Sequence, residues 1–198
     1  MFIRSRITTP AVFNPATAER KFTIMASDYA YHVILADVLF DAYSEAPGVS
    51  FELLTTDRFA IERLERGEID AVMTVNSYLS SLHPQKAIYA DDHAVICWSE
   101  SVHRGGLSEN SYLEAGHVVA VFGADKNPAF TESFLGQQNI RRRVEVSVQS
   151  FTAMPPAVVG TNRLATMYRR HAELFAKSLP ITIHEPPLPM PSIVESIQ

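Results

Sequence analysis

The chain has 198 residues, of which 46% are hydrophobic and 20% are charged, values typical of a globular protein. Its formal net charge of −5 argues against general attraction to nucleic acid or to an anionic membrane. A single cysteine, Cys97, excludes an intramolecular disulfide, and no apolar stretch approaches the roughly 20 residues of a membrane span. Because the N-terminus shows no signal-peptide pattern either, we expect a cytoplasmic protein.

A strand that leads into a long helix dominates the start of the chain, after an expected linker or tail over residues 1–20. The apolar run over residues 22–26 predicts a buried strand. Ser27 and Asp28 follow it, and both residue types favour the N-cap of a helix. Ligands of open α/β sheets bind at the carboxyl ends of strands, beside helix N-termini, so this corner is the first candidate ligand site. The alternative is that both side chains only cap the helix.

The helix expected over residues 29–44 has too much apolar surface for one buried face. Its polar positions, among them Asp37 and Asp41, form one narrow stripe, and nearly all the others are apolar. Such a helix lies inside one large domain, or it packs on a sheet and also on a second subunit. The pattern alone leaves both interpretations open.

The alternation of strand and helix continues to residue 75 and predicts a parallel sheet. Strands are expected over residues 49–54 and 69–75, with a short helix over residues 58–66 between them. A β-α-β-α-β order implies right-handed crossovers and places the carboxyl ends of the strands at one edge. The polar residues that follow the three strands are Ser27, then Thr55 and Thr56, then Thr74 and Asn76.

The second half of the chain repeats the α/β alternation and predicts a second lobe. A strand over residues 85–89 still belongs to the first lobe. Strands of the second lobe are expected over residues 94–98, 118–122, 143–148, 164–168 and 181–183, and helices over residues 107–115, 130–135, 150–159 and 171–178. Residues 192–198 are expected to return to the first sheet. The predicted architecture is therefore lobe I over residues 21–92 and 187–198, with lobe II inserted over residues 93–186. A hinge of two crossings joins them, and clefts between such lobes are favoured small-molecule sites.

No motif points to catalysis, a metal or a cofactor. The seven histidines show no metal-ligand spacing, and the sequence contains no GxSxG, P-loop or GxGxxG motif. The only basic run, Arg141 to Arg143, fits a solvated strand edge better than a nucleic-acid contact, given the acidic balance of the chain. We therefore expect neither an enzyme nor a bound metal or cofactor.

Several segments resemble the effector-binding domain of LysR-type transcriptional regulators, most closely the branch of the nodulation activators and related aromatic-sensing regulators. They are FTIMASDYAYHVILADVL, LERGEIDAVMT, AIYADDHAVICWSE, GHVVAVFG, VQSFTAMPPAVVGTNRLATMYRRHA and LPITIHEPPLPMPSIVESIQ. The resemblance implies a type 2 periplasmic-binding-protein fold of two α/β lobes, an effector in the cleft, and head-to-tail dimers through the first long helix. Members also carry a winged helix-turn-helix and a linker helix that this sequence lacks. DNA is thus expected as a partner only of a full-length tetramer.

The strand ends that match the family predict a ligand site between the lobes. Lobe I would contribute Ser27, Asp28, Thr55, Thr56, Thr74 and Asn76, and lobe II would contribute Phe122, Gly123, Ser150, Phe151, Thr161 and Asn162. An aromatic ring at Phe151 could stack on a planar effector, and the charge of Asp28 favours a neutral or phenolic one. The alternatives are helix capping for the Ser, Thr and Asn side chains and a core position for Phe151.

The expected function is that of a regulatory domain that senses a small aromatic or phenolic effector and couples it to the geometry of DNA-binding domains. Two alternatives belong to other classes. One is a free-standing solute-binding protein of the same fold. The other is an enzyme on this scaffold, since one fold hosts unrelated chemistry, but the sequence shows no nucleophile–base pair.

Overall fold

The structure, a computed structural model, describes residues 14–123 and 125–198. Most of the predicted tail, residues 1–13, lies outside this part of the chain. The remaining residues of that segment, 14–20, contain regular structure. A 3-10 turn spans Pro15–Thr17 and is capped by the side chain of Asn14, and the first strand already begins at Arg20.

The first lobe is built on a five-stranded sheet in the order β2-β1-β3-β11-β4. Its strands are β1 (Arg20–Ala26), β2 (Val49–Thr55), β3 (Ala71–Val75), β4 (Lys86–Asp91) and β11 (Ile193–Ile197). Both β2 and β3 run parallel to β1, as the β-α-β-α-β order predicts. The sheet as a whole is mixed, because β11 returns from the second lobe and inserts antiparallel between β3 and β4.

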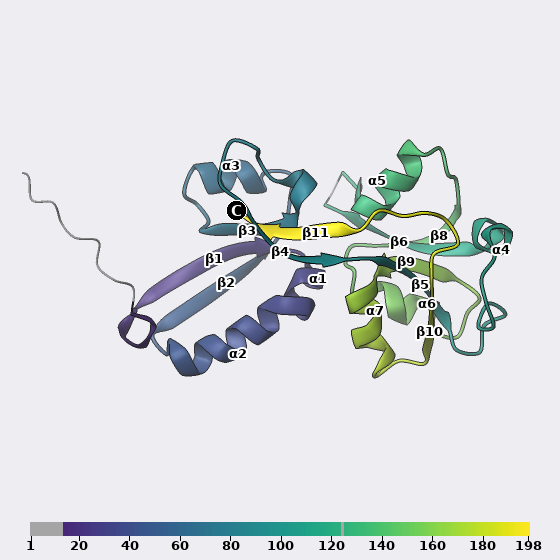
Figure 1. The fold of residues 1–198 in the computed structure, drawn as a ribbon, viewed down its shortest axis with the longest axis horizontal. Coiled ribbons are helices and arrows are strands. Elements are labelled where there is room, and N and C mark those ends of the chain that lie inside the picture. Colours follow the sequence, from purple (N-terminus) through teal and green to yellow (C-terminus); the bar gives the residue numbers. More distant parts are fainter. Residues whose placement is uncertain (1–13, 124) are drawn as a thin grey trace, which may run out of the picture.

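Helices cover both faces of this sheet. Figure 1 shows α2 (Ala36–Glu45) along one side of β1 and β2, and α3 (Ala60–Glu65) on the opposite side. The segment that leads into α2 comprises α1 (Asp28–Ala30) and a π-helical turn over Tyr31–Leu35. As predicted, Ser27 is the N-cap, and its Oγ accepts a hydrogen bond from the backbone N–H of Ala30 at 3.1 Å. The π turn was not predicted, since the apolar pattern does not distinguish it from an α-helix.

One face of α2 is left uncovered by the described residues. Phe40 is 78% exposed and Tyr43 is 85% exposed, and no residue of α2 is buried. The apolar excess of this helix is therefore not explained by burial inside the domain. Among residues 14–123 and 125–198, no helix has the length and apolar character that crossing a membrane requires.

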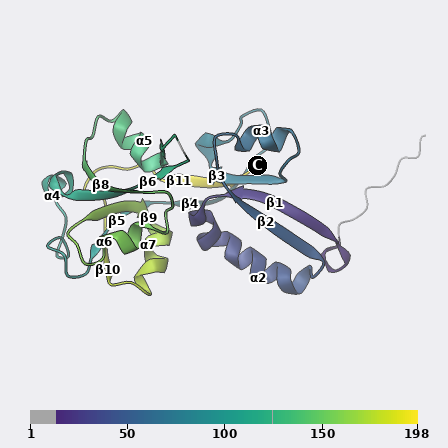
Figure 2. The same ribbon diagram turned by 180° about the vertical axis from the view of Figure 1, so that it is seen from behind.

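The second lobe is built on the sheet β10-β5-β9-β6-β7, with β8 also paired to β6. Its strands are β5 (His93–Trp98), β6 (Gly116–Phe122), β7 (Asn127–Pro128), β8 (Arg143–Val148), β9 (Leu164–Tyr168) and β10 (Ile181–His184). Its helices are α4 (Glu109–Glu114), α5 (Phe130–Gln137), α6 (Met154–Val158) and α7 (Arg169–Ala176). Figure 2 shows the two lobes side by side, with β4 and β11 lying between them.

Several predicted helix boundaries in this lobe differ from the observed ones, and two of the differences have a clear local cause. The helix expected from residue 150 begins at Met154, because the Ser150 hydroxyl accepts a hydrogen bond from the N–H of Ala153 and forms a separate turn. The helix expected to stop at Gly136 continues through it to Gln137, and the left-handed residue that follows is Asn139, with φ of 57°.

One hydrophobic core extends across both lobes. Tyr29 and Val75 from the first lobe pack in the same cluster as Ile96, Phe151 and Met167 from the second. The hydroxyl of Tyr29 also donates a hydrogen bond of 2.7 Å to Oδ2 of Asp91, at the end of β4 where the chain first crosses between the lobes. The lobes are therefore held in a defined arrangement, which fixes the shape of the space between their strand ends.

Candidate ligand-binding site

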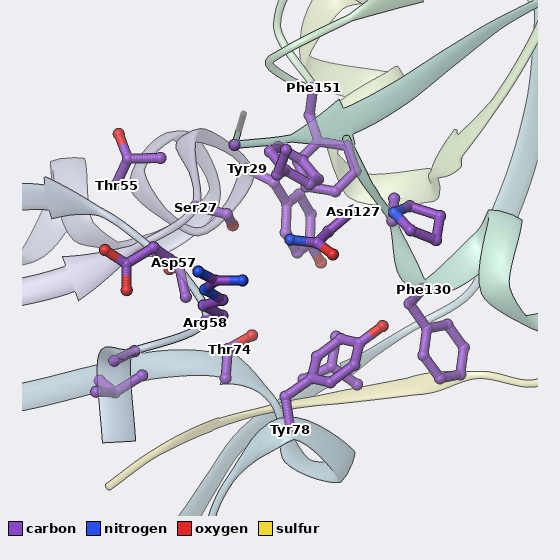
Figure 3. A pocket seen from close by; sticks show the side chains of 18 of the residues that line it. Ser27, Tyr29, Thr55, Asp57, Arg58, Thr74, Tyr78, Asn127, Phe130 and Phe151 are labelled. Atoms are coloured by element: carbon purple, nitrogen blue, oxygen red, sulfur yellow. The ribbon is translucent and has the colours of Figure 1, made fainter. Parts of the chain in front are cut away.

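A cavity of about 740 Å³ lies between the two lobes, at the carboxyl ends of β1, β2 and β3. Its volume is in the range of pockets that hold small organic ligands. Figure 3 shows polar side chains such as Ser27, Thr55 and Thr74 on the first lobe, with Phe151 entering from the second. The position agrees with the rule that open α/β sheets bind ligands at strand ends.

Eight of the predicted site residues come together in the lining of this cavity. They are Ser27, Asp28, Thr55, Thr56, Thr74, Phe122, Gly123 and Phe151. Gly123 adopts a positive φ of 70°, so the chain can turn sharply at the end of β6 where a side chain would strain the backbone. The side-chain oxygen of Thr56 is buried without a hydrogen-bond partner among the described residues.

The other four predicted residues lie outside the lining, and their local contacts explain why. Asn76 is exposed and begins a 3-10 turn. The Ser150 hydroxyl accepts a hydrogen bond from the N–H of Ala153 in the turn before α6, and the Thr161 hydroxyl donates one to the carbonyl oxygen of Val158. Oδ1 of Asn162 accepts a hydrogen bond from the N–H of Val102 at 3.1 Å. Hydroxyl and amide side chains that follow a helix can cap it or stabilise a turn as readily as they can line a cleft.

Aromatic rings form much of the cavity wall, and most of them were not predicted. The Phe151 ring lies 5.1 Å from that of Phe122, 5.5 Å from that of Tyr168 and 6.1 Å from that of Tyr29, between ring centroids. Figure 3 shows Tyr29 and Phe151 together on one side of the cavity, with Tyr78 and Phe130 on another. The centroids of this second pair are 6.4 Å apart. Such walls suit a planar aromatic guest.

Asp28 connects the two lobes beside the cavity. Its carboxylate accepts hydrogen bonds from the backbone N–H groups of Phe151 at 3.2 Å and of Thr152 at 2.7 Å. The charge that the sequence placed at the helix N-terminus is thus compensated by two amides of the opposite lobe. Asp28 therefore holds the lobes together from the edge of the cavity.

The sequence is similar to those of several nodulation proteins, although no family model matches it. It is 38% identical over 189 residues to nodulation protein D 1 of Mesorhizobium japonicum, covering 94% of this chain and 60% of that protein. It is 37% identical over 187 residues to nodulation protein D 2 of Rhizobium tropici, covering 94% and 59%. The chain is therefore similar to the nodulation D proteins over 94% of its own length. It spans about 60% of the length of these curated relatives.

Solved structures confirm the two-lobed fold of this nodulation-D-like chain. A probable transcriptional regulator of Pseudomonas aeruginosa superposes with a TM-score of 0.84 at 23% identity, covering 93% of this chain and 63% of that one. The regulatory domain of MexT, a transcriptional activator in the same organism, gives 0.76 at 21% identity, with 92% and 88% covered. The effector-binding domain of QuiR in complex with shikimate gives 0.69 at 10% identity, with 91% and 87% covered. The chain therefore shares the two-lobed α/β fold of these proteins.

Acidic side chains outnumber basic ones in the cavity of this nodulation-D-like domain. The carboxyl groups of its lining belong to Asp28, Asp57, Asp125 and Glu195, and its only basic group within the described residues is Arg58. An ion pair of 2.8 Å joins Arg58 Nη1 to Asp125 Oδ2, one residue from each lobe. Because both side chains are more than half exposed, this pair contributes little to stability.

Buried ionisable groups meet where the chain crosses between the lobes. Burial raises the pKa of Tyr29 far above its ordinary value, and it also raises the pKa of Asp91, to which Tyr29 donates. Burial and the nearby Asp91 raise the pKa of Glu195 to about 8. Sequence reasoning missed Glu195, because an acidic residue in a short terminal strand is expected to face solvent. Within the described residues, no group of three or more His, Cys, Asp or Glu side chains could hold a metal ion.

Proposed function

We propose that this chain is the effector-sensing domain of a longer LysR-type transcriptional regulator and that a small neutral aromatic or phenolic compound binds between its lobes. The observation that carries the proposal is the cavity of about 740 Å³, in which hydroxyl-bearing strand ends of one lobe face aromatic rings of the other. Rings supply apolar area and stacking, and hydroxyls fix the orientation of a planar guest. The QuiR effector-binding domain, which shares the fold and was solved in complex with shikimate, supports a small-molecule ligand.

A binding role fits this cavity better than a catalytic one. Ser27, whose hydroxyl stands at the strand-to-helix corner, accepts a hydrogen bond from the Ala30 amide and thereby caps the helix. The relatives that share the fold are transcriptional regulators. We therefore favour a sensor that works in the cytoplasm, where a regulator meets DNA, with a winged-helix domain of the longer protein making the DNA contact.

Self-association through α2 completes the proposal. Phe40 and Tyr43 expose apolar area on a helix face that none of residues 14–123 and 125–198 covers. Contiguous apolar area of this kind marks interaction sites. We propose that α2 of one domain packs on the second lobe of a partner domain, so that a change in the lobes alters the spacing of DNA-binding domains in a full-length tetramer.

Ligand binding to variants of Phe151 tests the cavity assignment. A neutral aromatic compound that binds the folded chain raises its melting temperature by mass action. Phe151→Leu keeps apolar volume but removes the ring, so we expect a roughly two- to tenfold weaker affinity, the equivalent of one aromatic pair. Phe40→Leu, the same change on the exposed face of α2, is the matched control. Equal affinities of both variants and the unchanged chain would show that the ligand binds elsewhere.

A further inference from the structure

Glu195 occupies an unusual position for a charged residue. It lies in β11, opposite Val75 of β3 and Tyr89 of β4, and is only 1% exposed. It also lines the cavity between the lobes. The pairing of β11 with β4 shifts register between Glu195 and Ser196, a β-bulge, and bulges redirect side chains. Glutamate is almost never fully buried unless it is paired, so this side chain requires an explanation.

One oxygen of the Glu195 carboxyl is buried without a hydrogen-bond partner in the described part of the protein. This oxygen, Oε1, is inaccessible to solvent and makes no hydrogen bond among residues 14–123 and 125–198. The titratable groups around it are Asp91 and Tyr89 of β4 and Tyr168 of β9. None of these carries a positive charge. The guanidinium of Arg170 stacks over the Tyr89 ring, with its central carbon 5.2 Å from the ring centroid.

The burial of Glu195 beside another acid, without a counter-charge, favours its neutral form near pH 7. Burial and the adjacent Asp91 raise its pKa to about 8, and no ion pair opposes this shift. A protonated carboxyl has one O–H donor together with an acceptor oxygen, whereas the ionised form can only accept. Apolar enzyme sites use neutral carboxyls as hydrogen-bond donors in this way.

We propose that Glu195 determines the specificity of the cavity, donating a hydrogen bond as a neutral acid to a carbonyl or hydroxyl oxygen of an uncharged planar effector. The inference rests on the proposed function, because it takes the cavity as the effector site. A carboxylate ligand would bring a further negative charge to a lining that already contains Asp28, Asp57 and Asp125. Arg58 offsets only Asp125, with which it pairs, and Asp57 pairs with Arg63 at 3.4 Å, so no basic group of the lining is free to pair with a carboxylate ligand. The selected class is thus the neutral aromatic ketone or phenol.

The test compares Glu195→Gln and Glu195→Leu with the unchanged chain, using ligands that do not titrate themselves. The probes are acetophenone and acetylnaphthalene, each matched by its carboxylate counterpart, benzoate or naphthoate. Isothermal calorimetry gives the Kd at about pH 6 and about pH 9.5. Glu114→Gln, on the exposed side of α4, is the control for the substitution itself.

The neutral ketones should bind the unchanged chain five- to tenfold more weakly at the higher pH, roughly the value of one hydrogen bond. Glu195→Gln keeps a donor that does not ionise, so its affinity should not change with pH, and Glu195→Leu should be weak at both values. The carboxylates should bind more weakly than the ketones throughout.

A ketone affinity that is equal at both pH values, or a pH profile that survives Glu195→Gln, would overturn the role of this side chain. Tighter binding of benzoate or naphthoate than of the matching ketone would do the same. Failure of every neutral aromatic probe to bind the unchanged chain would contradict the proposed function as well. If Phe151→Leu weakens binding but the Glu195 variants do not, the proposed function would hold and only the role of Glu195 in specificity would be refuted.

Discussion

Removing the negative charge of Asp28 should loosen the contact between the lobes. Its carboxylate accepts two backbone N–H groups of the opposite lobe, from Phe151 and Thr152, at 3.2 and 2.7 Å. In Asp28→Asn one of the two acceptors becomes an amide NH₂, which would face a backbone donor. Hydrogen bonds to a charged group contribute about 1.5–3 kcal/mol, and an unpaired buried donor costs a similar amount. We expect a loss of about 2–3 kcal/mol in the free energy of unfolding.

Thermal unfolding and small-angle X-ray scattering measure the two consequences of this substitution. A loss of 2–3 kcal/mol should lower the melting temperature by roughly 5–10 °C in a chain of this size. Scattering should show a larger radius of gyration as the lobes separate. Asp37→Asn is the matched control, because Asp37 lies on an exposed position of the same helical segment, and it should change stability by less than about 0.5 kcal/mol. If Asp28→Asn behaves like this control in both measurements, the carboxylate does not hold the lobes together.

Three further predictions concern a buried acid, a buried ion pair and the exposed helix face. The pKa of Glu195 is raised from 4.5 to about 8, so the free energy of unfolding falls as pH rises between those values, by at most about 5 kcal/mol. Chemical denaturation at a series of pH values should show this fall in the unchanged chain and not in Glu195→Gln. Glu132→Gln should cost about 3–5 kcal/mol in the same assay, because it leaves the 2% exposed Arg142 side chain without its counter-charge. Replacing Phe40 and Tyr43 together by Ser should lower the molar mass in light scattering while the domain stays folded, because both side chains are exposed. An unchanged molar mass in a self-associating chain would exclude this face of α2.

The histidines determine where the Glu195 effect can be seen. Burial lowers the pKa of His117 and of His171 to about 4, so these groups add stability as pH rises from about 4 to their ordinary value of 6.5. Their contribution opposes that of Glu195 over this interval and is constant above it. The decline caused by Glu195 should therefore emerge between about pH 6.5 and pH 8, and the comparison with Glu195→Gln isolates it.

The residues that the sequence alone placed near the cavity have one property in common. Their positions follow from the pattern of neighbouring residues in the chain. Ser27, Thr55 and Thr74 end predicted strands, and a parallel arrangement brings such ends together without any knowledge of side-chain packing. The two-lobe division followed from the same alternation. These features depend on hydrophobic period and on N-cap chemistry, both of which are visible within about ten neighbouring residues.

The residues that the sequence missed depend on contacts between distant segments. Glu195 reaches the cavity because β11 inserts between β3 and β4 and bulges beside Ser196, and nothing within β11 encodes its neighbours. Tyr78 and Phe130 meet from a 3-10 turn of one lobe and a helix of the other. Thr161 is the opposite case, a residue that was predicted in the cavity but lies outside its lining. A threonine hydroxyl suits a cleft or a turn equally well, and here it donates a hydrogen bond to the carbonyl oxygen of Val158.

The location of these groups explains how a ligand could change the arrangement of the lobes. A ligand shifts a conformational equilibrium only by the difference in its affinity for the two states. Glu195 and Thr74 lie on the first lobe and Phe151 on the second, so a guest that contacts all three favours the arrangement in which they face each other. The Asp28 bonds favour that same arrangement without a ligand. If Asp28→Asn reduces the population of this state, the apparent affinity for a neutral aromatic ligand must fall by the same factor. Loosening by Asp28→Asn with no loss of affinity would mean that the ligand contacts one lobe only, and such a ligand could not transmit a signal through lobe closure.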